Sequence, residues 1–183
     1  MPKIDLYRNV HKGQRARLFA LAVDVGSADP EAMKDVAEQC LEITQELREH
    51  ADHEDTFIHP LLRNRAPQVA EALDAEHVRL DAALAELDVH ARALPAVSAE
   101  ERPDAQHRLY LSLNELISAY LAHLHAEETV AMPALWNYCS GDELGAAFQA
   151  FLDSRTPDER ALDMRRMLFA LPPSVRAEIA PHA

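Results

Sequence analysis

Apolar positions recur at alternating steps of three and four residues along four long segments of the chain. The stripes run from Ile4 to Val25, from Val36 to Leu61, from Ala70 to Leu94 and from Leu109 to Ala134. This spacing places the apolar side chains on one face of each helix, and four such faces can bury one another. Short connections make consecutive helices antiparallel. The pattern therefore predicts an all-α protein, an up-down-up-down antiparallel four-helix bundle.

Helix-breaking residues are few, and they fall between the striped segments. The main breaks are Asp29-Pro30, Asn64–Pro67 and Leu94–Pro103. After the fourth segment, Thr156 and Glu159 have the spacing of a capping box, which predicts a further helix that ends before Pro172. We therefore expect a bundle domain over residues 1–138 and a short C-terminal helical extension over residues 139–183. The extension is expected to pack on the bundle or to form a dimer contact.

Six ionisable residues interrupt the apolar stripes. They are His11, His50, Glu54, His77, His123 and Glu127. Four of them form two copies of the motif HxxxE, in which both side chains lie on one face of a helix. A proline, Pro60 or Pro133, follows each glutamate six residues later. At a rise of ~1.5 Å per residue, counting from the turns brings all six residues to nearly one level of the bundle.

The six residues together favour a metal site. A single histidine on a stripe, such as His11 or His77, is more often a hydrogen-bonded core residue than a ligand, and a glutamate could pair with arginine. An unpaired carboxylate in an apolar core is costly, however, and six ionisable groups at one depth are hard to explain without a metal. Four imidazoles and two carboxylates suit iron, manganese or zinc better than calcium or magnesium. A metal-free helical interaction domain is the alternative.

Several polar residues lie close to the six candidate ligands. Tyr7 and Tyr120 each precede a candidate histidine by one turn, and we expect them to be core residues with a hydroxyl partner. Gln14 could hydrogen-bond an exogenous ligand or face another helix. His53 and His125 lie beside the stripes, and we expect them to contact the ligands or to mark the edge of the site. The remaining histidines are expected to be solvated: His59, His90, His107 and His182.

Charge and composition limit the partners and the compartment. The 183 residues carry a net charge of −13, which repels a phosphate backbone, so we expect no nucleic-acid partner. Asp24 interrupts the only apolar stretch near the N-terminus, so neither a signal segment nor a membrane span is expected. The two cysteines form no CxxC motif, which favours reduced thiols in a cytoplasmic protein.

The order of the six residues resembles the hemerythrin-like family, also called HHE cation-binding domains. The shared pattern is one histidine, HxxxE, one histidine and HxxxE over residues 1–138. The resemblance implies two iron ions with a bridging oxygen species, where manganese or zinc could replace iron. It also implies that Glu54 and Glu127 bridge the two ions. His11 and His50 would then complete one ion, and His77 and His123 the other.

Two departures from the oxygen-carrying hemerythrins bear on function. Those proteins have an additional histidine where this chain has Leu73, and a longer His-to-Asp spacing where it has His123 and Glu127. Missing ligands leave coordination positions open, which favours reactivity with a small diatomic or peroxide ligand over reversible oxygen carriage. The expected function is a di-iron protein that binds or reduces O2, H2O2 or NO, with peroxide disproportionation as the first reaction to test. The alternatives are an O2 or iron sensor or carrier without turnover, and a di-iron oxygenase acting on an organic substrate.

Overall fold

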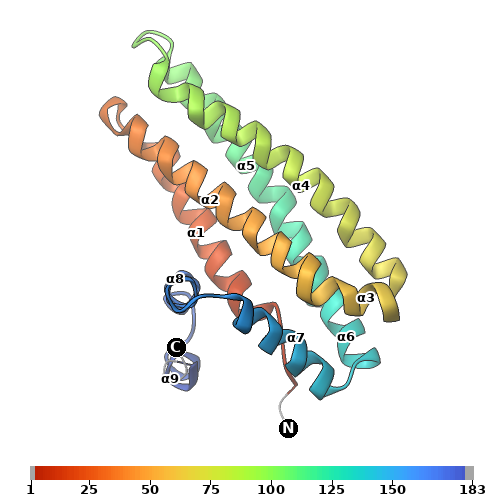
Figure 1. The fold of residues 1–183 in the computed structure, drawn as a ribbon. Coiled ribbons are helices and arrows are strands. Elements are labelled where there is room, and N and C mark those ends of the chain that lie inside the picture. The colour runs from red at the N-terminus through yellow and green to blue at the C-terminus, as the bar shows by residue number, and fades with distance from the viewer. Residues whose placement is uncertain (1–2, 180–183) are drawn as a thin grey trace. The chain divides into compact units, whose positions relative to one another are not determined.

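A computed structural model describes residues 3–179, in which every regular element is helical (Figure 1). This confirms the all-α class predicted from the stripes. The α-helices are α1 (Arg8–Ser27), α2 (Met33–His53), α3 (His59–Arg65), α4 (Pro67–Ala93), α5 (Arg102–Ala126), α6 (Met132–Tyr138), α7 (Gly141–Ser154), α8 (Pro157–Leu168) and α9 (Pro173–Ile179). Short 3₁₀ helices occupy Pro30–Ala32 and Leu94–Ala96, and π-helical turns occupy Glu54–Ile58 and Glu127–Ala131. None of the described helices is long and apolar enough to cross a membrane.

The chain forms two compact units, which are described separately. Within the described residues, the first unit comprises residues 3–16, 53–73 and 124–179, and the second comprises residues 17–52 and 74–123. Each unit therefore combines segments that are distant in the sequence. Helices α1, α2, α4 and α5 supply residues to the second unit, whereas α3, α6 and the C-terminal helices belong to the first.

In the second unit, polar contacts join neighbouring helices around the apolar stripes. Arg17 of α1 pairs with Glu46 of α2, and the Thr44 hydroxyl of α2 donates to Asp88 of α4 at 2.5 Å. The Gln106 amide of α5 donates to the backbone carbonyls at the C-terminal end of α1. The buried apolar residues include Leu18, Leu21, Ile43, Leu47, Leu84, Leu87, Leu113 and Leu116. Burial of the striped faces, predicted from the sequence, is the main source of stability of this unit.

In the first unit, an apolar cluster lies beside the start of α1. It contains Tyr7, Leu62, Ala70, Leu73, Ala131, Met132, Leu135 and Leu144. The C-terminal helices pack closely on this unit. A Cβ atom added at Gly13 of α1 would lie 2.5 Å from the Arg166 carbonyl oxygen of α8, so only glycine permits this approach. The predicted capping box of Thr156 and Glu159 is confirmed at the start of α8.

The two prolines that follow the HxxxE motifs explain the two π-helical turns. Proline has no backbone N–H, and its ring clashes with the carbonyl four residues earlier in a regular α-helix. At both sites the helix widens by one residue before the proline. The His59 N–H donates to the Glu54 carbonyl, and the Met132 N–H donates to the Glu127 carbonyl, each across five residues.

The extra residue in each π-helical turn shifts the buried face of the helix by one position. A 3–4 count continued past each glutamate predicts Leu61 and Val130 on the apolar stripes. The prediction for Val130 is wrong, and Leu61 packs against the core but is less buried than the next residue. Leu62 is 1% exposed while Leu61 is half-buried, and Ala131 is fully buried while Val130 is 51% exposed. The strict 3–4 count therefore holds only as far as each glutamate.

The π-helical turn also changes the environment of His59. We expected a solvated side chain, but His59 is fully buried, and its Nδ1–H donates to the Asp55 carboxylate at 2.9 Å. His107 is exposed as expected, while His90 is half-buried. His182 lies outside the described residues. An extra residue in the helix moved His59 from the predicted outer face to the interior.

The two thiols differ in burial, and this difference gives a prediction. Burial, with the nearby charge of Asp88, raises the pKa of the Cys40 thiol to about 12, whereas Cys139 is only half-buried. Since the thiolate is the reactive form, the native protein should react with a thiol reagent at Cys139 alone. We expect about one reactive thiol per chain at neutral pH and two after denaturation. In the Cys139→Ser variant the native count should fall to about zero, and a count of one there would contradict the buried position of Cys40.

Candidate metal site

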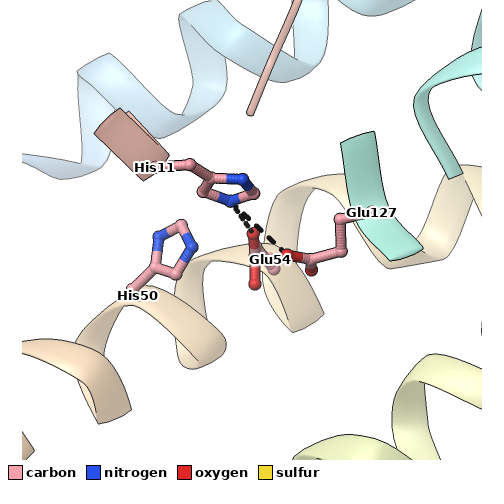
Figure 2. A group of neighbouring side chains, drawn as sticks. All are labelled: His11, His50, Glu54 and Glu127. Atoms are coloured by element: carbon pink, nitrogen blue, oxygen red, sulfur yellow. Dashed lines mark ion pairs between the residues drawn. The ribbon is translucent and has the colours of Figure 1, made fainter. Parts of the chain in front are cut away.

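The imidazole of His11 lies against two buried carboxylates in the first unit. Its Nε2 atom is 3.7 Å from Glu54 Oε1 and 3.4 Å from Glu127 Oε2 (Figure 2). His11 and Glu127 are fully buried, and Glu54 is 1% exposed. Three helical segments thus direct one nitrogen and two oxygen donors towards one another.

These distances match donors that share a metal ion. Two donor atoms that each lie ~2.1 Å from one ion, at an angle of about 90–120° to each other, are roughly 3.0–3.6 Å apart. A direct N–H···O hydrogen bond would bring the heavy atoms to about 2.7–3.2 Å. The observed contacts of His11 are longer than such a bond and close to the spacing of a shared ion. The donor geometry therefore fits a bound metal.

The π-helical turns place both glutamates. Glu54 and Glu127 are each the first residue of a π-helical turn, one helical turn after His50 and His123. π-Helical turns inside α-helices occur frequently at functional sites. Each carboxylate is therefore positioned by a π-helical turn that precedes a proline.

In the second unit, two histidines face each other. His77 Nε2 of α4 lies 3.1 Å from His123 Nε2 of α5. The Nδ1–H of His123 donates to Glu76 Oε2 at 2.9 Å. With its proton held on Nδ1, a neutral His123 directs the lone pair of Nε2 towards His77. This is the tautomer that a metal bound through Nε2 requires.

His11 has the same kind of carboxylate partner. Its Nδ1–H donates to Glu128 Oε1 at 3.0 Å, and Arg15 donates to the same oxygen at 2.6 Å. A carboxylate on the second nitrogen fixes the tautomer and ring orientation of a metal-binding histidine and increases its basicity. Glu128 and Glu76 therefore orient the Nε2 atoms of His11 and His123.

The electrostatics of His11 follow from these contacts. Burial alone lowers its pKa, but the hydrogen bond to Glu128, together with Glu54 and the charge of Glu127, raises it from 6.5 to about 9. The hydrogen bond from His11 is also the main reason that the pKa of Glu128 falls to about 2. Without a metal, a protonated His11 compensates the buried carboxylates. A metal ion would take over this role and displace the proton.

All six residues predicted from the sequence fall into groups with metal-ligand spacing. In one group, donor atoms of His11, His50, Glu54 and Glu127 lie within 4.8 Å of one another, and Figure 2 shows these four side chains. In a second group, the same spacing joins donor atoms of Glu54, His77, His123 and Glu127. The two glutamates belong to both of these groups, and each of the two offers two imidazoles and two carboxylates, a donor set that suits iron, manganese or zinc. A third group with this spacing joins Asp55, His59 and His77 and contains neither glutamate.

The neighbouring residues show what the sequence did not reveal. Glu76 and Glu128 were not singled out, because each looks like one of the many acids of a solvated helix face. Their positions directly before His77 and directly after Glu127 were the only available signal.

His53 contacts Phe151 of α7 and Arg155, whereas His125 is exposed. Gln14 is 2% exposed, and its Oε1 atom accepts no hydrogen bond from the described residues.

The chain belongs to the hemerythrin family. Residues 3–135 match the Hemerythrin HHE cation binding domain, which confirms the resemblance inferred from the HxxxE motifs. The comparisons with curated proteins and with solved structures gave no match. The family is thus a cation-binding one, and the His and Glu groups described above are residues of this chain that could bind the metal.

Removing the charge of Glu128 should weaken metal binding without unfolding the protein. In the Glu128→Gln variant, His11 loses its charged partner, and such changes typically reduce metal affinity about 10–100-fold. Competition with a chromophoric chelator would measure the affinity. Glu115→Gln, which changes an exposed glutamate of α5, is the matched control and should leave the affinity unchanged. Equal affinities in both variants would show that Glu128 does not support the site.

Proposed function

We propose that the protein is a non-haem di-iron protein that binds or reduces a small oxidant. The observation that supports this most directly is that Glu54 and Glu127 belong to both four-residue donor groups. Carboxylates shared in this way would bridge two ions, with His11 and His50 on one ion and His77 and His123 on the other. Manganese or zinc could occupy the same donors, and the test below distinguishes the metals.

The protein residues would hold, orient and shield the ions. Glu76 and Glu128 accept hydrogen bonds from the Nδ1–H groups of His123 and His11, which leaves the Nε2 atoms directed towards the site. The buried carboxylates balance the charge of the metal in a site from which water is largely excluded. When bound, a pair of iron ions would supply electrons and open coordination positions for O2, H2O2 or NO.

The proposed architecture is the antiparallel four-helix bundle expected from the stripes. In the second unit, the contacts Arg17–Glu46, Thr44–Asp88, His77–His123 and Gln106–Val25 join each helix to the next and return to the first. Thr44 of α2 contacts Asp88 of α4. Arg48, which lies later in α2, contacts Asp88 and also Asp81, which lies earlier in α4. This trend supports antiparallel neighbours.

Four protein donors per ion support a reactive site. Iron commonly accepts six ligands, and each four-residue donor group supplies four. The position one turn before His77 is Leu73, a buried apolar residue that offers no donor. Open positions favour binding of a peroxide or diatomic ligand, so peroxide disproportionation is the activity to assay first. A sensor or carrier would bind the same ligand without consuming H2O2, and the assay separates the two.

An oxygenase acting on an organic substrate would need a cavity that opens onto the site. A cavity of about 620 Å³ is lined by residues of α1 and α5, among them Gly26, His107 and Tyr110, and by none of the six candidate ligands. This cavity does not favour an oxygenase. A cytoplasmic location and a homodimer remain predictions from the sequence.

Metal analysis and an optical spectrum test the proposal. Protein from iron-replete growth should carry about two iron ions per chain and show near-ultraviolet absorption of an oxygen-bridged ferric pair. Glu54→Ala or Glu127→Ala should disturb both ions, since each carboxylate bridges. His77→Ala should leave one position partly filled, because His77 serves one ion. A two-site fit of a metal titration would measure the difference.

Two outcomes would contradict the di-iron assignment. Full metal content in the His50→Ala, His123→Ala double variant would show that the metal lies elsewhere. Equal, single-site losses in the Glu and His variants would indicate two independent mononuclear sites.

Acid should reduce the stabilisation that the metal provides. Metal binds only neutral imidazoles, and binding to the native state raises the melting temperature by mass action. The pKa of His11 is about 9 without metal, above its usual 6.5, so protonation of His11 stabilises the metal-free protein below about pH 6.5, and this contribution is lost as the pH rises through 9. The difference in melting temperature between the loaded and metal-free proteins should therefore shrink between about pH 8 and pH 5. A constant difference, or none at pH 8, would show that the six residues are structural.

A further inference from the structure

Tyr7 lies at the metal site but is not one of the candidate ligands. It directly precedes α1, its ring centroid is 5.4 Å from that of His11, and its side chain is fully buried. The hydroxyl group has no hydrogen-bond partner among the described residues. A buried hydroxyl without a partner is uncommon in a protein, which indicates that a ligand completes its hydrogen bonding.

The charges of the site act on the Tyr7 hydroxyl. Its pKa is raised well above 10, first by burial and then by the charges of Glu127, Glu54 and Asp5. The phenol therefore lies within the field of both candidate bridging carboxylates. A phenol hydroxyl is a hydrogen-bond donor, with an ordinary pKa of about 10.

Tyr7 also packs against apolar side chains. Tyr7 belongs to the cluster that contains Leu73 and Ala131, and Leu73 occupies the position one turn before His77. Tyr7 thus contacts both an apolar cluster and the candidate ligand His11. A small molecule bound beside Tyr7 would meet a hydrogen-bond donor next to apolar side chains.

We propose that the Tyr7 hydroxyl donates a hydrogen bond to the exogenous ligand of the metal centre and favours anionic acceptors, such as hydroperoxide and azide, over NO. This inference rests on the proposed function and adds a ligand class to it. Hydrogen bonds to charged acceptors are stronger than those to neutral ones. NO is a weak acceptor, so this hydrogen bond adds little to its affinity. The same hydrogen bond adds more to the affinity of an anion.

Azide is a suitable probe, because it is an anionic acceptor that the protein does not consume. In oxidised, iron-loaded Tyr7→Phe protein, the dissociation constant for azide, measured by optical titration, should rise about tenfold at unchanged iron content. Binding of NO to the reduced protein should change by less than about twofold. Tyr120→Phe is the matched control, since Tyr120 is 3% exposed and its ring lies 6.1 Å from that of His123.

Each outcome of this experiment decides the proposal. Unchanged azide affinity in Tyr7→Phe would overturn it, and equal weakening in Tyr120→Phe would assign the effect to general packing. A visible tyrosinate-to-iron band that is lost in Tyr7→Phe would make Tyr7 a ligand rather than a donor. Wild-type protein that holds no iron would refute the proposed di-iron function itself, a result distinct from normal iron content with unchanged azide affinity.

Discussion

The burial of two carboxylates in an apolar interior is the constraint on which the site depends. Glu54 and Glu127 are 1% and 0% exposed, and removing such charges from water is costly unless positive charge accompanies them. His11 supplies that charge in the metal-free protein, and burial, Glu128 and the two carboxylates together set its pKa at about 9. Metal ions would supply it more strongly. The same residues that would destabilise a metal-free core therefore create a strong preference for a bound cation.

The helices depart from regular α-helical geometry where the buried carboxylates lie. Pro60 and Pro133 each follow a π-helical turn that begins at a buried glutamate, so a defect in helix geometry coincides with each bridging candidate. Glu76 and Glu128, at the partly exposed edge of the site, hold the proton of His123 or His11 on Nδ1. Local backbone geometry thus directs the buried carboxylates, and two further acids orient the imidazoles of His123 and His11.

Much of this could be predicted from the sequence, because the signals were periodic. The stripes gave the helices and their buried faces, and their six polar interruptions gave the residues that the structure groups at metal-ligand spacing. A proline six residues after a glutamate does not by itself predict a π-helical turn, so the predicted buried face differs from the observed one by one residue near Leu61 and Val130. His59 was misjudged for the same reason. Glu76 and Glu128 could not be separated from solvated acids, since their role depends on contacts between helices.

X-ray diffraction from crystals of the iron-loaded protein, recorded on both sides of the iron absorption edge, would test the central claim most directly. If Glu54 and Glu127 bridge two iron ions, two anomalous peaks should appear about 3.5–4 Å apart, both within bonding distance of these glutamates. One peak should lie next to His11 and His50, and the other next to His77 and His123. A single peak, or peaks that do not share the two glutamates, would contradict this claim.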